Sequence, residues 1–338
     1  MYINRNFNLI RLLRYSWHVI LTYMFYAACC VALYEHLDCK WLQIPWLPIS
    51  IIGTAVAFYV GFKNNSAYDR TWEARKIWGA IVNSSRSWGI MVKDFITPKY
   101  SDKEVSKEDL HQIHQELMYR HIVWLYGLRR QLWQPKSWEH NRPFNARYRK
   151  FLAGHFAKES MEDELAPFLD EEELKWAMAR KNTATHLISK QSERLKELHF
   201  SGLFDDFRHV EMKNMLVDFY TQQGKCERIK NFPFPRQYAS SSFIFISIFI
   251  ILLPFGLMSE FNKIGSHAVW MTVPFTALVG WVYWLMESVG DYAENPFEGL
   301  AFDTPMTALC RTIEIDLREM LGETDLPPAI QPKESALL

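Results

Sequence analysis

The stretch LQIPWLPISIIGTAVAFYVGF, residues 42–62, contains no aspartate, glutamate, lysine or arginine. Its length matches the ~20 residues with which a helix crosses a bilayer. In the hydrocarbon core every backbone polar group must be satisfied within the segment, so a helix is the structure expected here. The stretch therefore predicts a membrane-spanning helix and, with it, an integral membrane protein.

Three further stretches share this length and this lack of charge. Residues 16–34, 239–258 and 268–286 are equally free of aspartate, glutamate, lysine and arginine. Tryptophan and tyrosine occur near the ends of the stretches, where an aromatic belt meets the membrane surface. The four stretches fall into two pairs, each joined by a short loop. The expected fold class is an all-α membrane protein with four transmembrane helices and a cytoplasmic helical body.

Charge and composition exclude several classes of protein. The chain has 338 residues, with 38 basic and 38 acidic side chains, so bulk charge gives no reason to expect a nucleic-acid partner. Its five cysteines form no CxxC pair, which argues against a zinc site or a disulfide framework. The sequence shows no Ser/His/Asp arrangement and no phosphate-binding glycine loop. We expect no enzymatic activity, no cofactor and no metal site.

Basic residues on the flanks of the spans predict the orientation. The N-terminal tail carries Arg5, Arg11 and Arg14 and no acid, and basic residues also follow the second span and precede the third. The two hairpin loops hold few charges. Under the positive-inside rule, both termini and the central insert face the cytoplasm. The chain is therefore expected to be a multi-pass protein of the cell inner (plasma) membrane.

These features divide the chain into four segments. Residues 1–62 hold the tail and the first transmembrane pair, and residues 63–238 form the cytoplasmic helical insert. Residues 239–290 hold the second pair, and residues 291–338 form a C-terminal cytoplasmic segment. Helical spacing of apolar residues predicts helices in both cytoplasmic segments. The expected helices are 65–92, 108–133, 171–199, 203–229 and a last one from Thr304 and Pro305 to Met320.

A smooth face runs along the second span. Gly53, Ala57 and Gly61 recur every four residues, so they share one side of the helix. Small side chains let membrane helices approach one another closely. These three residues are the expected helix-packing face.

A second face lies one step around the same helix and carries Thr54, Phe58 and Phe62. One interpretation is that both faces simply pack inside a helix bundle. The other is that several subunits place this helix around an axis, where the rings form an apolar constriction. Hydrophobic constrictions can gate ions by dewetting, without a fixed charge. The spacing leaves both interpretations open.

Three separated motifs resemble one family. The stretch GFKNNSAYDRTWEARKIWGAIVNSSRSW, residues 61–88, is similar to the signature of the bacterial bestrophin homologues. CERIKNFPFP, residues 226–235, and ENPFEGLAFDTPMTALCRTIEIDLREMLG, residues 294–322, resemble later elements of that family and occur in the same order. The resemblance covers most of the chain, from about Arg14 to Gly322, although residues 100–172 carry no matching motif.

The resemblance implies a homopentameric ion channel with one central pore on the five-fold axis. The three neck positions of the family correspond to Thr54, Phe58 and Phe62. The first of them is usually a larger residue, so Thr54 is a departure that affects the tightness of the upper ring. The family's lower cytoplasmic aperture corresponds to Phe234, between two prolines. The implied partners are other copies of the chain, the lipid bilayer and small inorganic ions.

The acidic residues after the last span are relevant to whether the protein binds calcium. Animal members of the resembled family bind calcium at an acidic cluster, and this chain has only Glu298 and Asp303 there. Calcium takes about 6–8 oxygen ligands, so we expect no calcium activation. His111, His114 and His121 share one expected helix but lack the HExxH order of a zinc site.

The expected function is a passive channel for small inorganic ions, and the resemblance favours anions such as chloride. A cation-selective channel of the same architecture is the first alternative. A non-conducting membrane scaffold is the second, and it predicts monomers or dimers without a continuous pore. A membrane-embedded lipid-modifying enzyme would need clustered polar residues at the interface, but Glu287, Asp291 and His18 are not clustered in the sequence.

Overall fold

The computed structural model describes residues 1–338 except residues 7, 101–104, 141–159, 334–335 and 338. Among the described residues, four helices are long and apolar enough to cross a membrane. The chain divides into two compact units, which we call the membrane unit and the helical body. The membrane unit comprises residues 4–71 and 233–295, and the helical body comprises residues 1–3, 72–232 and 296–338.

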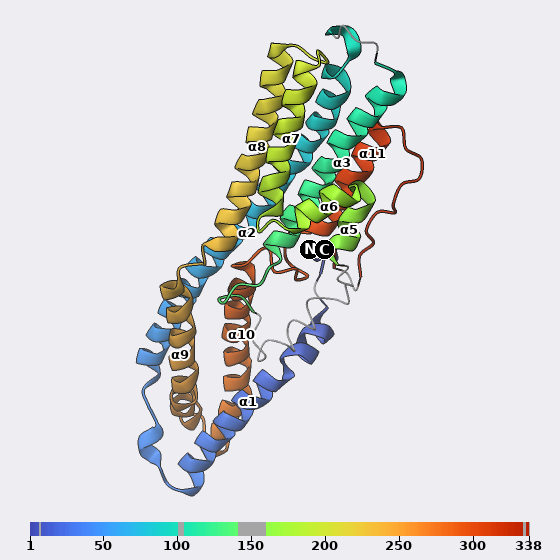
Figure 1. The fold of residues 1–338 in the computed structure, drawn as a ribbon. Coiled ribbons are helices and arrows are strands. Elements are labelled where there is room, and N and C mark those ends of the chain that lie inside the picture. Colours follow the sequence, from blue (N-terminus) through green and yellow to red (C-terminus); the bar gives the residue numbers. More distant parts are fainter. Residues whose placement is uncertain (7, 101–104, 141–159, 334–335, 338) are drawn as a thin grey trace. The chain divides into compact units, whose positions relative to one another are not determined.

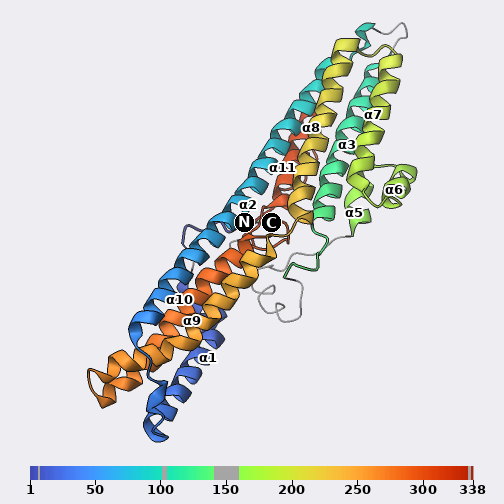
Figure 2. The same ribbon diagram turned by 90° about the vertical axis from the view of Figure 1, so that its left-hand side faces the viewer.

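The membrane unit is a bundle of long helices. α1 (Leu9–His36) packs on α10 (Thr272–Ala293), and α10 packs on α9 (Arg236–Asn262). The first part of α2 (Trp46–Phe95) lies beside α9, as Figures 1 and 2 show. The four predicted spans are thus confirmed as helices. α1 and α9 extend beyond the predicted spans at both ends, whereas α2 and α10 begin four residues after the predicted starts and continue beyond the predicted ends.

The interior of the membrane unit is apolar where α2 meets α9. Ile49, Val56 and Val60 of α2 form a buried cluster with Phe249 and Leu253 of α9. These residues of α2 recur at helical spacing, so they form one buried side of the helix. This packing settles which side of α2 faces the rest of the bundle.

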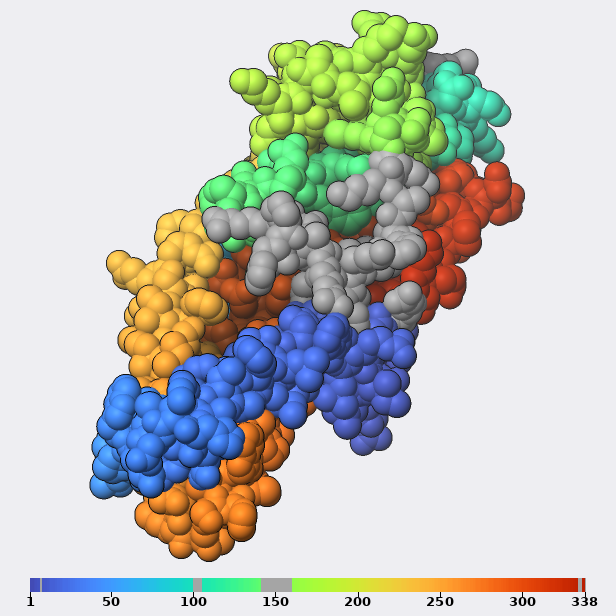
Figure 3. Space-filling model, turned by 90° about the horizontal axis from the view of Figure 1, so that it is seen from below, coloured from blue at the N-terminus to red at the C-terminus, as the bar shows by residue number. Residues whose placement is uncertain are grey.

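The connections between the helices are tied to the bundle. The turn before α10, η5 (Ser266–Met271), packs against α1 and α9. The N–H of Ile44, just before α2, donates to the carbonyl of Phe255 in α9 at 3.3 Å. In Figure 3 the blue atoms of α1 and the segment that follows it lie beside the orange atoms of the α9–α10 connection. The hairpins are therefore part of the packed unit.

The helical body combines the second part of α2 with helices from distant parts of the chain. α3 (Lys107–Leu132) packs on α7 (Thr183–Phe200), which packs on α8 (Asp206–Asn231). α11 (Met306–Met320) packs on α3, as Figure 1 shows. Two short α-helices among the described residues of this unit are α5 (Met161–Leu165) and α6 (Glu171–Met178).

Aromatic side chains fill the core of the helical body. Trp78 and Trp88 of α2 and Trp124 of α3 are each at most 1% exposed. The rings of Trp88 and Trp124 lie 5.9 and 5.1 Å from the ring of Phe219. His121 lies in the same cluster, 4.5 Å from the Phe219 ring, and burial lowers the pKa of His121 to about 3. This histidine is therefore a neutral core residue.

α2 differs from the prediction because it is one continuous helix of 50 residues. The sequence predicts a span that ends at residue 62 and a separate helix from residue 65. The segment boundary drawn after residue 62 thus falls inside α2, and the two units divide between Thr71 and Trp72. Residues 63–71 contain neither proline nor glycine, so nothing in the backbone ends the helix there.

Residues 171–199 also differ from the prediction, because they form two helices rather than one. α6 ends at Met178 and α7 begins at Thr183. The side-chain oxygen of Asn182 accepts a hydrogen bond from the N–H of Thr185 at 3.0 Å. Asparagine is favoured at such helix starts and disfavoured in helix interiors, which explains the break. The other three predicted cytoplasmic helices, α3, α8 and α11, are confirmed with shifts of a few residues at their ends.

Candidate functional site

The face of α2 that carries the predicted neck residues is not covered by the described residues of the chain. Phe58 is 67% exposed and Phe62 is 71% exposed, and Thr54 is also exposed. The Thr54 hydroxyl donates to the Ser50 carbonyl at 2.9 Å, so it is directed back along its own helix. The surface offered here consists of two aromatic rings and a threonine, without a charge.

The same face of α2 becomes polar beyond Phe62. Asn65, Ser66 and Asp69 follow at helical spacing and are exposed. Residues three and four apart lie on one side of a helix. Along this line α2 passes from aromatic rings to hydrogen-bonding groups within two turns. Such a face suits a helix that borders a dry constriction and then a wetter space.

The three residues of the predicted packing face have different surroundings. Gly53 is buried against α9, where a Cβ would lie 2.6 Å from Cε2 of Phe249. Ala57 is half-buried. Gly61 has open space where a side chain would project. Gly53 is thus engaged within the chain, whereas packing between chains at Gly61 remains a prediction.

Phe234, the predicted aperture residue, is only 6% exposed. It lies in the connection between α8 and α9, between Pro233 and Pro235. Phe232, two residues earlier, is 67% exposed. Within a single chain the ring of Phe234 is mostly covered, and its role at an aperture remains a prediction.

A charged cluster lies inside the membrane unit, and sequence reasoning did not identify its members as partners of one another. The Lys63 ammonium pairs with the Glu287 carboxylate, and the Ser242 hydroxyl donates to the same carboxylate. Lys63 is one of the basic residues that follow the second span in the sequence, yet its side chain is only 1% exposed. Its position one residue after Phe62 is the signal that could have found the cluster, because neighbouring residues point to different sides of a helix.

Glu298 and Asp303 are buried in the helical body and are engaged there. Oε1 of Glu298 lies 2.9 Å from Nδ1 of His140, and Asp303 accepts a hydrogen bond from the N–H of Leu300 at 3.0 Å. Burial raises the pKa of Asp303 to about 7, which disfavours the ionised form that a hard cation needs. Across the described part of the chain, no three His, Cys, Asp or Glu side chains are arranged to hold a metal ion.

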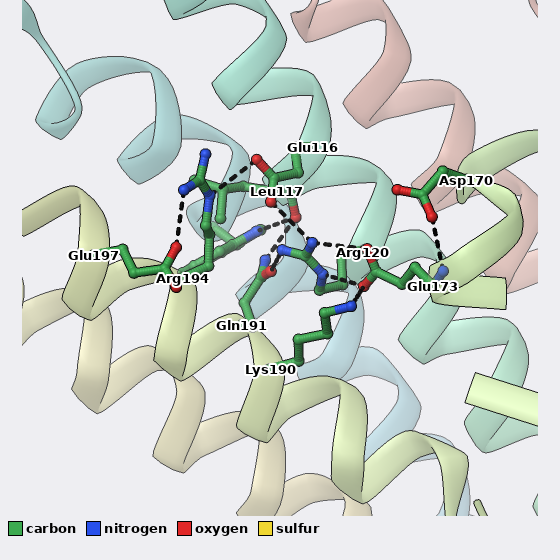
Figure 4. Close-up of polar contacts among 10 residues, drawn as sticks. Glu116, Leu117, Arg120, Asp170, Glu173, Lys190, Gln191, Arg194 and Glu197 are labelled. Carbon is green, nitrogen blue, oxygen red and sulfur yellow. Dashed lines mark hydrogen bonds and ion pairs between the residues drawn. The ribbon is translucent and has the colours of Figure 1, made fainter. Parts of the chain in front are cut away.

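An ion-pair network connects α3, α6 and α7 within the helical body (Figure 4). Arg120 donates from Nε and Nη2 to the two carboxylate oxygens of Glu173, at 2.6 and 2.9 Å. Its Nη1 donates to Gln191 at 3.1 Å. Glu116 accepts from both Arg120 and Arg194, at 2.9 and 3.0 Å. Because these groups satisfy one another, the network serves to dock the short helix α6.

Comparisons with known proteins agree with this architecture. The family model described as "Bacterial/Fungal Bestrophin protein" matches residues 13–319. "Voltage-dependent anion channel-forming protein YneE" of Escherichia coli (strain K12) is 27% identical over 319 residues, which cover 94% of this chain and 90% of that protein. "Voltage-dependent anion channel-forming protein mll4386" of Mesorhizobium japonicum is 27% identical over 287 residues, which cover 85% and 78%.

Solved structures show the same fold. The crystal structure of a bacterial bestrophin homolog from Klebsiella pneumoniae has a TM-score of 0.74 and 22% sequence identity. The match covers 91% of this chain and 98% of that one. The helix arrangement is therefore shared, and the family model spans nearly the whole sequence. From these findings we conclude that the chain belongs to the family of bacterial and fungal bestrophin proteins.

Proposed function

We propose that this protein is an ion channel whose pore is lined by the exposed face of α2. The observation that carries the proposal is the exposure of Phe58 and Phe62, on the side of α2 opposite the buried Val56 and Val60. Rings of such side chains around an axis make a narrow, dry passage. Passages of this kind control ion flow through hydration and need no charged gate.

Anions such as chloride are the proposed substrate class. The relatives from Escherichia coli and Mesorhizobium japonicum are named as anion channel-forming proteins, and this supports the assignment. The neck face of α2 carries no charge between Thr54 and Phe62. Aromatic rings have a positive edge, so ring edges turned toward the axis favour an anion over a cation. Phe234 is the proposed lower aperture.

The proposal includes a homopentamer around one central pore, because a single copy of this bundle cannot surround a water path. A closed ring needs two different surfaces on each chain. α8 offers one such surface, since Phe207, Val210, Asn214 and Val217 are all exposed at spacings of three and four residues. This spacing is typical of a helix that packs along another helix. Phe207 is 87% exposed in the single chain, which supports its proposed contact with another subunit.

The proposed location is the cell inner membrane, with both termini and the insert in the cytoplasm. Arg5, Arg11 and Arg14 in the N-terminal tail support this orientation under the positive-inside rule.

The decisive experiment is the reversal potential of the purified protein in planar bilayers under asymmetric potassium chloride, with the oligomer mass measured on the same preparation. A shift toward the chloride equilibrium potential supports the anion channel. A shift toward the potassium potential assigns the cation-selective alternative. Absence of both current and pentamers favours the scaffold.

The neck assignment has its own test in Phe58→Ala combined with Phe62→Ala. We expect a higher unitary conductance because the apolar constriction widens, and a barrier lowered by about 1.4 kcal/mol raises a rate tenfold. Phe25→Ala is the matched control, because Phe25 is a 73% exposed ring on α1 of the same unit. Unchanged conductance in the double variant, or an equal rise in the control, contradicts the neck assignment.

A further inference from the structure

A buried ion pair lies inside the membrane unit, one residue from the proposed neck. The Lys63 side chain is 1% exposed and the Glu287 side chain is 11% exposed. The lysine ammonium contacts Oε1 of Glu287, and the Ser242 hydroxyl donates to Oε2. Ser242 is itself fully buried. The cluster joins α2, α9 and α10 at one level.

A second contact holds the next residue of α2. Nδ2 of Asn64 donates to the Met286 carbonyl of α10 at 3.0 Å. Gly290 permits this approach, because a Cβ at that position would lie 2.0 Å from Oδ1 of Asn64. Two consecutive residues of α2 are therefore held against α10.

The buried charges make the rotation of α2 specific. A charge inside a membrane bundle is costly unless it is paired, and losing one partner leaves the other uncompensated. If α2 turned about its own axis, Lys63 would leave Glu287. Consecutive residues point about 100° apart around a helix, so a lysine held inside the bundle keeps Phe62 turned outward. The 71% exposure of Phe62 agrees with this geometry.

We propose that Lys63, Glu287 and Ser242 are positioning residues that orient the Phe62 ring and thereby set the width of the neck. They act through α2 and do not contact the permeating ion. Apolar packing alone tolerates several rotations of a helix, whereas a buried polar cluster selects one register. This inference rests on the proposed function, because it requires Phe62 to line the pore.

The experiment measures the relative permeability of a large and a small anion. Chloride is placed on one side of a planar bilayer and gluconate on the other, and the reversal potential is recorded. Phe62→Ala is the reference, because it widens the neck at the ring itself. If the wild-type channel proves cationic, potassium and N-methylglucamine replace the two anions.

The main variant is Lys63→Met with Glu287→Leu, which removes both charges and so leaves no buried charge without its partner. We expect it to assemble and to shift the reversal potential in the same direction as Phe62→Ala, because the ring is no longer held at the axis. The charge exchange Lys63→Glu with Glu287→Lys is expected to restore the wild-type value. Lys263→Met, which removes an exposed lysine of the same unit, is the control and should cause no shift.

A combination with Phe62→Ala separates positioning from general damage. Once the ring is absent, removing the ion pair should add no further shift, since interacting residues are not additive. An additive shift overturns the positioning role. So does a wild-type reversal potential in the assembled apolar variant. If the apolar variant does not assemble, the charge exchange decides: assembled channels with the wild-type value support the role, and failure to assemble overturns it.

Failure of this inference is distinguishable from failure of the proposed function. If Phe62→Ala leaves the reversal potential unchanged, the neck assignment is lost and the positioning role with it. If Phe62→Ala causes the shift and the apolar variant does not, only the positioning role is lost.

Discussion

Both units of the molecule bury apolar and charged side chains, and the comparison between them concerns where large aromatic side chains lie. In the helical body, Trp88 and Trp124 are inside, at no more than 1% exposure. In the membrane unit, Phe25 and Phe243 point outward, at 73% and 65% exposure, while the charged side chain of Lys63 is inside. Water expels apolar surface from the outside of a protein, whereas lipid accepts it and instead drives polar groups inward. The surrounding solvent therefore decides what counts as a core.

The units consequently depend on different interactions. The helical body gains its stability from buried aromatic area, and its ion pairs dock peripheral helices. The membrane unit gains nothing from moving an apolar side chain between lipid and bundle, so close helix approach and satisfied polar groups hold it together. Equivalent substitutions should therefore have different effects in the two units.

The largest loss of stability is expected for Trp124→Ala in the helical body. Removing a fully buried indole costs about 3–5 kcal/mol of unfolding free energy. The change also leaves Gln223 without the indole N–H that donates to it at 3.0 Å. The unfolding temperature of the detergent-purified protein measures the loss. The control is Trp41→Ala in the membrane unit, where the side chain is 79% exposed. Similar decreases in unfolding temperature for both variants would contradict the proposed difference between the two units.

A smaller loss is expected for Glu173→Gln, which removes the charge that Arg120 binds. Hydrogen bonds to charged groups contribute about 1.5–3 kcal/mol. The matched control is Glu171→Gln on the same helix, where the side chain is 83% exposed and pairs with Lys175. Exposed pairs contribute about 0–1 kcal/mol, so the control should be close to wild type.

The same variant has a pH signature. Burial alone would raise the pKa of Glu173. The hydrogen bonds and the positive charge of Arg120 lower it by more than burial raises it, so the pKa of Glu173 lies below its usual 4.5. A depressed folded-state pKa means that the stabilisation is present at neutral pH and is lost as the pH falls. The difference in unfolding temperature between wild type and Glu173→Gln should therefore shrink in acid. A constant difference across the pH range would contradict this origin.

Gly53→Ala tests whether close helix packing stabilises the membrane unit. The added Cβ would lie 2.6 Å from the Phe249 ring, so the two helices must separate or the ring must move. Overpacking of this kind costs about 1–3 kcal/mol. Gly79→Ala, further along α2, is the matched control because open space surrounds that position. Thermal stability and pentamer yield should fall for Gly53→Ala, and normal stability there would refute close packing of α2 on α9.

A pH-dependent effect is expected for Asp303→Asn. Burial raises the pKa of Asp303 from 3.8 to about 7. An acid with a raised folded-state pKa stabilises the fold at low pH, and this contribution is lost as the pH rises through the folded value. The stability of Asp303→Asn relative to wild type should therefore rise as the pH increases from 3.8 to about 7, and this difference should stay constant above pH 7. Unfolding temperatures measured across that range test the sign.

The sequence predicted the spans and most helices of the helical body because the deciding signals are local. A charge-free run of bilayer length and the spacing of apolar residues need no knowledge of the partner helix. The break before α7 was missed, although Asn182 was a local signal for it. The face with Phe58 and Phe62 was identified from four-residue spacing, which left open whether it is buried, and their exposure within the chain is a property of the packed bundle.

By itself, the sequence determined the four membrane helices, the helical insert and the family, since these follow from runs and motifs of neighbouring residues. Only the tertiary structure decided that Lys63 is buried against Glu287, a partner 224 positions away. It also decided that Gly53 is covered by Phe249 while Gly61 stays open. The physical reason is that a side chain's burial and pairing depend on which helix lies opposite, and spacing along one helix does not specify that neighbour.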